Sequence, residues 1–248
     1  MARRGAALVT GAARRIGRAL ALTAAEAGYD VVVHHRESEE DAEATARAVR
    51  KADVRAAVLA ADLTQADPRE LIDKATEALG PVTLLVNNAS VFLDDRLETF
   101  TRESWDAHME ANLHAPIALT KAFAAALDGE GLVVNLVDQR VWRPNPQFFT
   151  YSLAKAGLWW ATRTMAQSLA PRIRVNAIGP GPTLPSIHQG DSDFEAEASG
   201  VLLGKRTTPE EIAGALRYLI DASSVTGQMI AVDAGQHLGW KTPDITDE

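Results

Sequence analysis

Tyr151 and Lys155, in the stretch "YSLAK", have the residue types and the spacing for acid–base chemistry. Residues four apart share one face of a helix, so the phenol and the ammonium can lie together. A phenol has an ordinary pKa of about 10, and a neighbouring ammonium lowers it by favouring the phenolate. We therefore expect Tyr151 to protonate an atom that becomes electron-rich as a hydride arrives.

An acid, Asp138, lies thirteen residues before Tyr151 in the stretch "NLVDQRVW". A carboxylate at this position could hydrogen-bond the tyrosine hydroxyl. A turn residue at the end of a strand is the alternative explanation, and the residues alone leave both open.

The segment "ALVTGAARRIGRALA" (7–21) has the pattern of a dinucleotide site. It passes from a strand into a helix through Gly11 and Gly17, so backbone N–H groups at the helix N-terminus can approach a pyrophosphate. Arg15 stands where the usual fingerprint has its middle glycine. An ordinary strand–helix turn would also explain this segment.

The end of the next apolar run, "VVVHHRE" (31–37), indicates which nucleotide would bind. The NAD form of the fingerprint has an acid there, whereas Arg36 offers a guanidinium that suits a 2′-phosphate. Arg14 could add positive charge nearby, and Glu37 would partly oppose it. We predict NADP(H) as the cofactor, with His34 and His35 either beside it or simply polar residues at a strand end.

The elements that must position these residues are short apolar runs separated by amphipathic segments. The runs are residues 6–10, 31–35, 56–60, 83–89, 131–137, 173–179 and 229–235. Nearly continuous apolar runs are typical of strands buried on both faces of a parallel sheet. Asp67 and Thr208, each followed by proline, have the pattern of helix N-caps.

This alternation predicts an α/β fold, a single Rossmann-like domain over residues 1–248. Its doubly wound parallel sheet would carry helices on both faces. Residues 180–207 are the least regular and most polar stretch, so we expect a substrate lid there. We expect residues 241–248 to form a surface tail.

Composition excludes several classes of function. Hydrophobic residues make up 46% of the 248 positions and charged residues 23%, as in globular proteins. The net charge of −8 without a basic cluster argues against a nucleic-acid partner. The chain has no cysteine, and nothing indicates a metal site. No apolar run approaches the length that crosses a bilayer, so we expect a soluble, cytoplasmic protein with no membrane partner.

Together these segments resemble the classical short-chain dehydrogenase/reductase family, over essentially the whole chain. The motifs that carry the resemblance are "TGAARRIG" (10–17), "ADL" (61–63), "NNAS" (87–90), "EANLHAP" (110–116), "YSLAK" (151–155), "RVNAIGPGPT" (174–183) and "VTGQMIAVDAG" (225–235). The resemblance implies a nicotinamide cofactor, a homotetramer or homodimer, and a role for Asn112 in holding a water against Lys155. The helix "AGLWWATRTMAQSLA" (156–170) could form such an interface or be a buried core helix.

The cofactor-binding residues that these motifs imply span the chain. They are Gly11, Arg14, Arg15, Ile16, Gly17, His34, His35, Arg36, Asp62, Leu63, Asn88, Ala89, Ser90, Tyr151, Lys155, Pro180, Gly181 and Thr183. Asp62 is placed to accept from an adenine amino group, although an isolated Asp is more often a turn residue.

Most members of the family have a serine at the position of Asp138. The acid is similar to that of a subgroup, the pteridine reductases and bacterial dihydromonapterin/dihydrofolate reductases. Arg15 matches the subgroup's arginine that faces pyrophosphate and pterin, Ser90 its pterin-contacting serine and Phe92 its stacking aromatic. The resemblance implies NADPH-dependent reduction of a pterin C=N bond in a dihydropterin or dihydrofolate. The implied catalytic residues are Asp138, Tyr151, Lys155 and Asn112, and the implied substrate-binding residues are Arg15, Ser90, Phe92, Asp138 and Tyr151.

Two other functions stay open. The chain could reduce 3-oxoacyl thioesters or other small carbonyl compounds, with Asp138 tolerated in place of serine. It could also be a non-catalytic NADP(H)-binding sensor or scaffold. The presence of Tyr151, Lys155 and Asn112 together argues against this second alternative.

Overall fold

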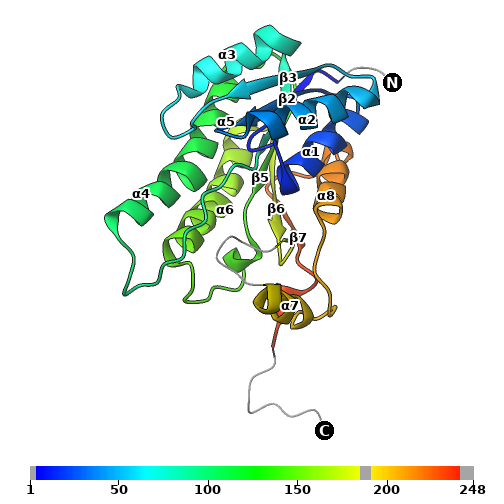
Figure 1. Ribbon diagram of the computed structural model, residues 1–248. Helices are drawn as coiled ribbons and strands as arrows, with labels where there is room; N and C mark the ends of the chain where they lie inside the picture. Colours follow the sequence, from blue (N-terminus) through cyan, green and yellow to red (C-terminus); the bar gives the residue numbers. More distant parts are fainter. Residues whose placement is uncertain (1–3, 185–190, 241–248) are drawn as a thin grey trace.

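Seven parallel strands form one sheet at the centre of the computed structural model, which describes residues 4–184 and 191–240 (Figure 1). In chain order they are β1 (Ala6–Val9), β2 (Asp30–His35), β3 (Ala56–Ala60), β4 (Val82–Asn87), β5 (Gly131–Leu136), β6 (Ile173–Pro180) and β7 (Met229–Val232). Their order in space is β3-β2-β1-β4-β5-β6-β7. Each expected apolar run forms a strand, and the predicted Rossmann-like sheet is confirmed.

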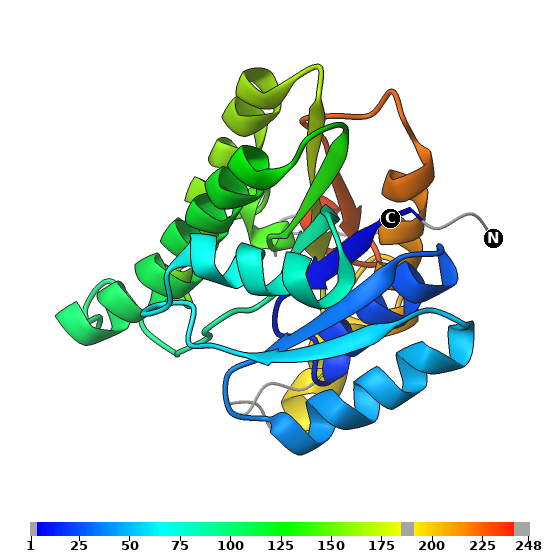
Figure 2. The same ribbon diagram turned by 90° about the horizontal axis from the view of Figure 1, so that it is seen from above.

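Helices cover both faces of the sheet (Figure 2). One layer holds α1 (Arg15–Glu26), α2 (Glu39–Val49) and α8 (Pro209–Asp221), and the other holds α3 (Pro68–Leu79), α5 (Ala115–Ala126) and α6 (Phe149–Leu169), with α4 (Arg102–Met109) against α6. Successive residues of β1 divide between the layers, Ala7 and Val9 on one side and Ala6 and Leu8 on the other. All four are fully buried, which explains why the run is apolar without alternation.

The described residues also form four short helical segments: η1 (Arg50–Ala52), η2 (Glu110–His114), η3 (Gln139–Val141) and η4 (Gln236–Leu238). The segment η2 is a π-helix between α4 and α5, and it contains Asn112. A π turn is rare and is often found at functional positions.

The two predicted helix N-caps are confirmed. The side chain of Asp67 accepts a hydrogen bond from Arg69 N at the start of α3, with Pro68 as the first helical residue. Thr208 and Glu211 form a reciprocal capping box at the start of α8, since each side chain accepts from the backbone N–H of the other.

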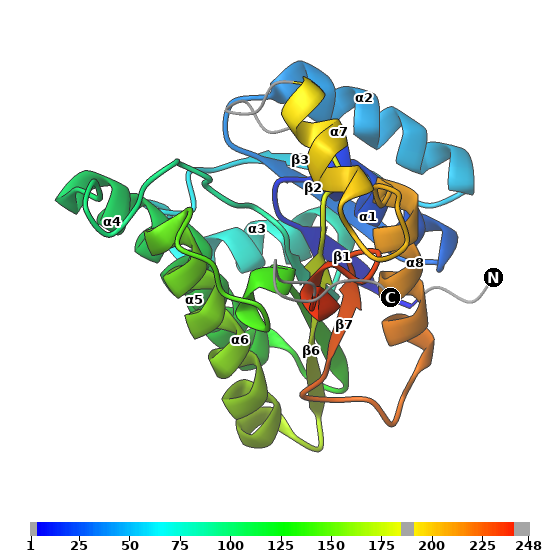
Figure 3. The ribbon, with the colours of Figure 1, turned by 90° about the horizontal axis from the view of Figure 1, so that it is seen from below.

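The stretch 180–207 is more regular than we predicted from its polar sequence. It contains a helix, α7 (Asp191–Ser199), which lies below the lower edge of the sheet in Figure 1 and across the same edge in Figure 3. Alanine and glutamate in "EAEA" (195–198) are good helix formers, a local preference that outweighs polarity. Residues 185–190 and the predicted tail 241–248 lie outside the described residues.

None of the helices within residues 4–184 and 191–240 has both the length and the apolar character that crossing a bilayer requires.

Candidate functional site

The predicted site residues gather where the strand order reverses, between β1 and β4. In doubly wound sheets the loops at the carboxyl ends of strands leave a crevice at this point. The turn after β1, the end of β2 and the segments after β4, β5 and β6 all contribute to it.

The glycine turn after β1 is packed tightly against the segment after β4. Gly11 has a φ of +60°, and a Cβ added to Gly17 would lie 2.1 Å from Gly11 O and 2.6 Å from Asn88 Nδ2. The Asn88 amide donates to Thr10 O at 2.9 Å and to Gly11 O at 3.1 Å. Because no side chain caps the first turn of α1, its backbone N–H groups are suited to an anion such as a pyrophosphate.

Arg15 adopts a backbone conformation that normally favours glycine. Its φ is +55°, which explains why the usual fingerprint has glycine there. Its guanidinium donates to Leu184 O at 3.3 Å, so the side chain points toward the stretch after β6. Burial and the charge of Arg14 lower the pKa of Arg15. Ile16, the next residue, is half-buried against the core.

His34 supports the glycine turn from within the protein. Gly11 N donates to its Nδ1 at 3.1 Å, so the ring proton lies on Nε2, which donates to Ala61 O at 3.1 Å. Burial lowers the pKa of His34 to about 4, so the ring is neutral at physiological pH. Both ring nitrogens of His34 are bonded within the protein, so in this structure the side chain supports the glycine turn, and its place beside the cofactor stays a prediction.

His35, the last residue of β2, and Arg36, which follows it, lie in different surroundings. His35 is buried, and its Nδ1 has no hydrogen-bond partner among the described residues. Arg36 is exposed and lies 3.1 Å from Glu37, the acid that we expected to oppose a phosphate. An exposed pair of this kind is weak and can exchange for a stronger bidentate partner.

Asp62, after β3, forms a turn with the residues that follow it. Its Oδ1 accepts from Thr64 N at 3.0 Å and from Thr64 Oγ1 at 2.8 Å. These hydrogen bonds lower the pKa of Asp62. Both bonds end on Oδ1, so Oδ2 is the oxygen that could accept from an adenine amino group, with half-buried Leu63 beside it.

The end of β6 approaches the segment after β7. Gly181 N donates to Val232 O at 3.0 Å, and a Cβ on Gly181 would lie 2.6 Å from Asp233 Cα. Thr183 donates to Gly181 O at 2.9 Å and lies 2.8 Å from Thr207 Oγ1. The threonine pair therefore joins the two ends of the stretch 180–207, which begins with Pro180.

Asp138 and Tyr151 meet as the sequence suggested. The Tyr151 hydroxyl donates to Asp138 Oδ2 at 3.1 Å. Asp138 Oδ1 accepts from Arg140 N at 2.8 Å, and the Arg140 guanidinium lies 3.2 Å from Oδ2. The side chains of this ion pair are 13% and 14% exposed. Asp138 is thus both a turn residue and a partner of the tyrosine.

The pKa of Tyr151 differs from our expectation. Burial raises it well above the usual value, and the neighbouring Asp138 charge raises it further. Lys155 Nζ donates to Leu136 O at 2.8 Å and lies 5.7 Å from the Tyr151 ring centre. The prediction of a lowered pKa for Tyr151 is wrong for this structure, because burial and the neighbouring Asp138 carboxylate both raise it. Burial lowers the pKa of Lys155 to about 8.

Asn112, which is fully buried in η2, holds the segment after β4. Its Oδ1 accepts from Ser90 Oγ at 3.0 Å and from Val91 N at 2.8 Å, and its Nδ2 donates to Val91 O at 2.7 Å. Backbone N–H groups of Asn88 and Ala89 donate to Thr10 Oγ1 on the other side. The side-chain amide of Asn112 is therefore committed to the loop that carries Ser90.

An aromatic cluster lies beside Tyr151. Phe92 stacks on Phe148 with ring centres 4.3 Å apart and an interplanar angle of 25°, and it meets Tyr151 edge-on at 4.7 Å. The guanidinium of Arg140 lies 5.4 Å from the Phe148 ring centre. The sequence reasoning did not identify Arg140 or Phe148. Their proximity in sequence to Asp138 and Tyr151 was the available signal.

Comparisons with known proteins agree with this architecture. The family described as Enoyl-(Acyl carrier protein) reductase matches residues 11–237. A 3-oxoacyl-[acyl-carrier-protein] reductase of Synechocystis is 33% identical, over 92% of this chain and 95% of its own.

Two solved structures are also similar. The FolM alternative dihydrofolate reductase 1 from Brucella suis, in complex with NADP, is 47% identical, with a TM-score of 0.95 over 99% of this chain and 100% of that chain. A blue fluorescent protein from a metagenomic library, in complex with NADPH, is 29% identical, with a TM-score of 0.88 over 94% and 98%.

Proposed function

The chain belongs to the short-chain dehydrogenase/reductase family, and we propose that it is an NADPH-dependent reductase of a pterin-type C=N bond, in a dihydropterin or a dihydrofolate. The observation that carries this proposal is the hydrogen bond between Tyr151 and Asp138. The similarity to a dihydrofolate reductase that was crystallised with NADP supports both the substrate class and the cofactor.

The residues of the nucleotide crevice fit NADP(H). The positive φ of Gly11 and the uncapped first turn of α1 suit a pyrophosphate, to which Arg14, Arg15, Ile16 and Gly17 would contribute. Arg36 would bind the 2′-phosphate, and it directly follows buried His35, whose Nδ1 has no hydrogen-bond partner among the described residues. The remaining contacts would come from Asp62, Leu63, Asn88, Ala89, Ser90, Tyr151, Lys155, Pro180, Gly181 and Thr183.

When bound, NADPH supplies the hydride that reduces the carbon of the C=N bond. Tyr151, neutral because of its raised pKa, donates its proton to the ring nitrogen. Lys155, whose pKa is about 8, can then return a proton to the phenolate. Asp138 orients the tyrosine hydroxyl and can accept a hydrogen bond from a ring N–H group, which a serine would do less strongly.

Recognition of the substrate would depend on groups around this pair. Phe92 offers a ring against which a flat, electron-poor pterin can stack, and Phe148 and Tyr151 fix the plane of that ring. Ser90 and Arg15 would hydrogen-bond the polar edge of the pterin. The side chain of Asn112 would act indirectly, because it holds Ser90 in place.

Reduction of a 3-oxoacyl thioester is the second candidate, and the 33% identity to a reductase of that class favours it. A non-catalytic NADP(H) sensor fits less well. A sensor does not need the arrangement of Asp138, Tyr151 and Lys155 described above.

Purified protein separates these three functions. We expect NADPH oxidation with dihydropterins or dihydrofolate and none with acetoacetyl thioesters. Turnover with carbonyl compounds alone would refute the proposal, and NADPH binding without any turnover would favour the sensor. Asp138→Ser should lose most pterin turnover while the Kd for NADPH stays nearly constant, and equal activity would remove the argument from Asp138.

We also propose that the chain assembles into a homotetramer or homodimer through α6. On this helix Trp160 is 66% exposed and Leu153 is 40% exposed, so both offer apolar surface that a second copy of the chain could cover. Light scattering gives the mass of the assembly, and Trp160→Glu should reduce it if α6 forms the contact.

A further inference from the structure

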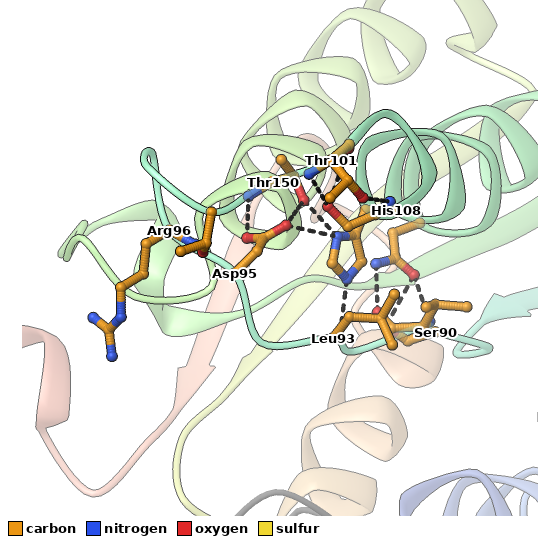
Figure 4. A network of polar contacts seen from close by, with 11 residues as sticks. Ser90, Leu93, Asp95, Arg96, Thr101, His108 and Thr150 are labelled. Carbon is orange, nitrogen blue, oxygen red and sulfur yellow. Dashed lines mark hydrogen bonds and ion pairs between the residues drawn. The ribbon is translucent and has the colours of Figure 1, made fainter.

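A buried polar network connects the loop after β4 to the start of α6. Figure 4 shows Asp95 in that loop, His108 on α4 and Thr150 on the first turn of α6. Thr150 directly precedes Tyr151, and Asp95 follows Phe92 by three positions. All three polar side chains are buried, with exposed fractions of 4%, 0% and 0%.

The direction of each hydrogen bond in this network follows from one donor. Leu93 N can only donate, so His108 Nε2 accepts its proton at 3.0 Å. The ring proton therefore lies on Nδ1 and is donated to Thr150 Oγ1 at 2.7 Å. The Thr150 hydroxyl in turn donates to Asp95 Oδ2, and Thr150 N donates to Asp95 Oδ1 at 3.0 Å. Every polar atom named here has a partner.

The charges are consistent with these directions. Burial lowers the pKa of His108, although Asp95 opposes the change, so the ring is neutral. Burial raises the pKa of Asp95, but the hydrogen bonds from Thr150 and Ser104, together with nearby His108, outweigh it, and the pKa lies below its usual value. The ionised Asp95 carboxylate is thus the final acceptor in a chain of hydrogen bonds that begins at the backbone N–H of Leu93.

We propose that Asp95, His108 and Thr150 are positioning residues that fix the loop carrying Phe92 against the helix that carries Tyr151. The network bonds Leu93, the residue after Phe92, to Thr150, the residue before Tyr151, and the two aromatic rings meet edge-on with centres 4.7 Å apart and planes that differ by 88°. The His108 ring also contacts the Tyr151 ring, at 5.9 Å between centres. This inference rests on the proposed function, because it assigns the network to binding of the ring substrate.

The network is separate from the glycine turn that would hold the pyrophosphate. Its bonds join the loop after β4, α4 and α6, whereas the glycine turn and its support His34 lie on β1, β2 and the segments that follow them. Loss of the network should therefore change substrate turnover much more than affinity for NADPH. A residue with only a structural role would change neither at a temperature where the protein stays folded.

Thr150→Val is the test, because valine keeps the shape of threonine and removes the hydroxyl. The change leaves His108 Nδ1 without an acceptor and removes one of the two bonds from Thr150 to Asp95. We expect kcat/KM for dihydropterin to fall roughly 10- to 100-fold, with both a raised KM and a reduced kcat. The Kd for NADPH, measured by fluorescence titration, should change by less than about twofold.

Two variants serve as controls. Thr150→Ser keeps the hydroxyl and should return kcat/KM to within about threefold of the unmodified chain. Thr162→Val, also on α6, removes another buried hydroxyl, one that donates to Leu158 O and accepts from Asn135 Nδ2 at 2.8 and 2.9 Å. It should lower the melting temperature by a similar amount and leave kcat/KM unchanged.

The assay also separates this inference from the proposed function. Should the unmodified chain reduce only acetoacetyl thioesters, the pterin proposal fails and the same variants are compared with that substrate. Unchanged kcat/KM in Thr150→Val, an equal loss in Thr162→Val, or no recovery in Thr150→Ser would overturn the positioning role. A chain that reduces neither substrate overturns both proposals.

Discussion

Asp138 has two roles in this structure, which a pair of substitutions can separate. Its carboxylate accepts a hydrogen bond from the Tyr151 hydroxyl. It also forms an ion pair with the guanidinium of Arg140, in which the side chains of Asp138 and Arg140 are 13% and 14% exposed. Asn at this position has one oxygen for three donors, so either the backbone N–H or the guanidinium of Arg140 faces an amide N–H group. We expect Asp138→Asn to lose both turnover and stability.

The magnitude follows from the surroundings of Arg140. Breaking a fully buried ion pair costs about 3–5 kcal/mol, because the remaining charge has no partner. Since some solvent reaches this pair, about 2–3 kcal/mol of unfolding free energy should be lost in Asp138→Asn. Adding Arg140→Met removes the unpartnered cation and keeps a long side chain over the Phe148 ring. The double variant should recover to within about 1 kcal/mol of the unmodified chain.

Turnover should not recover with stability. The Tyr151 hydroxyl lacks a carboxylate partner in both variants, so the rate of NADPH oxidation with dihydropterin should stay reduced by roughly 100-fold or more. Urea unfolding of the cofactor-free protein measures the first effect, and initial rates measure the second. A double variant that regains turnover would show that the carboxylate acts only by neutralising Arg140, and a loss below about 1 kcal/mol in Asp138→Asn would refute the ion-pair argument.

Three further predictions test other parts of the site. Arg36→Ala should raise the Kd for NADPH roughly tenfold or more and leave the Kd for NADH almost unchanged, and equal shifts would contradict the 2′-phosphate assignment. Because φ at residue 15 is +55°, Arg15→Gly should be more stable in urea than Arg15→Ala by about 0.5–1 kcal/mol, and equal midpoints would mean that the backbone is not strained. Lys155 has a folded pKa of about 8, below its ordinary value of 10.5, so the folded protein binds fewer protons than the unfolded chain between these values. The unfolding free energy of the cofactor-free protein should therefore rise by roughly 2–3 kcal/mol from pH 8 to pH 10, and this rise should be absent in Lys155→Met.

The sheet could be predicted because a strand that is buried on both faces has apolar residues at nearly every position. A run such as Ala6–Val9 is apolar at every position, and each of its side chains enters the core. The caps at Asp67 and Thr208 depend on local backbone geometry and were equally readable. The helix at 191–199 was missed because we weighed the polarity of 180–207 above the helix preference of its alanines and glutamates.

The site was less predictable where tertiary contacts decide the geometry. The sequence suggested a contact between Asp138 and Tyr151. The hydrogen bond from Arg140 to the Asp138 carboxylate could not be foreseen, because it depends on the short helical turn η3. Phe148 reaches Phe92 through a φ of +52° just before α6, which is unusual for an aromatic residue. The pKa of Tyr151 depends on burial and on the partner of its hydroxyl, and neither can be deduced from the four-residue spacing of Tyr151 and Lys155.

The ion pair of Asp138 and Arg140 also bears on the design of inhibitors. A cationic amidine that seeks a carboxylate would meet oxygens that already accept bonds from a guanidinium and a phenol. Its binding would have to displace one of these donors or share an oxygen with it, so the gain from its charge should be smaller than at an unpaired acid. Compounds that are neutral at the Asp138 carboxylate and offer a single N–H donor lose less on desolvation, and they are the better starting point for inhibitors that contact this ion pair.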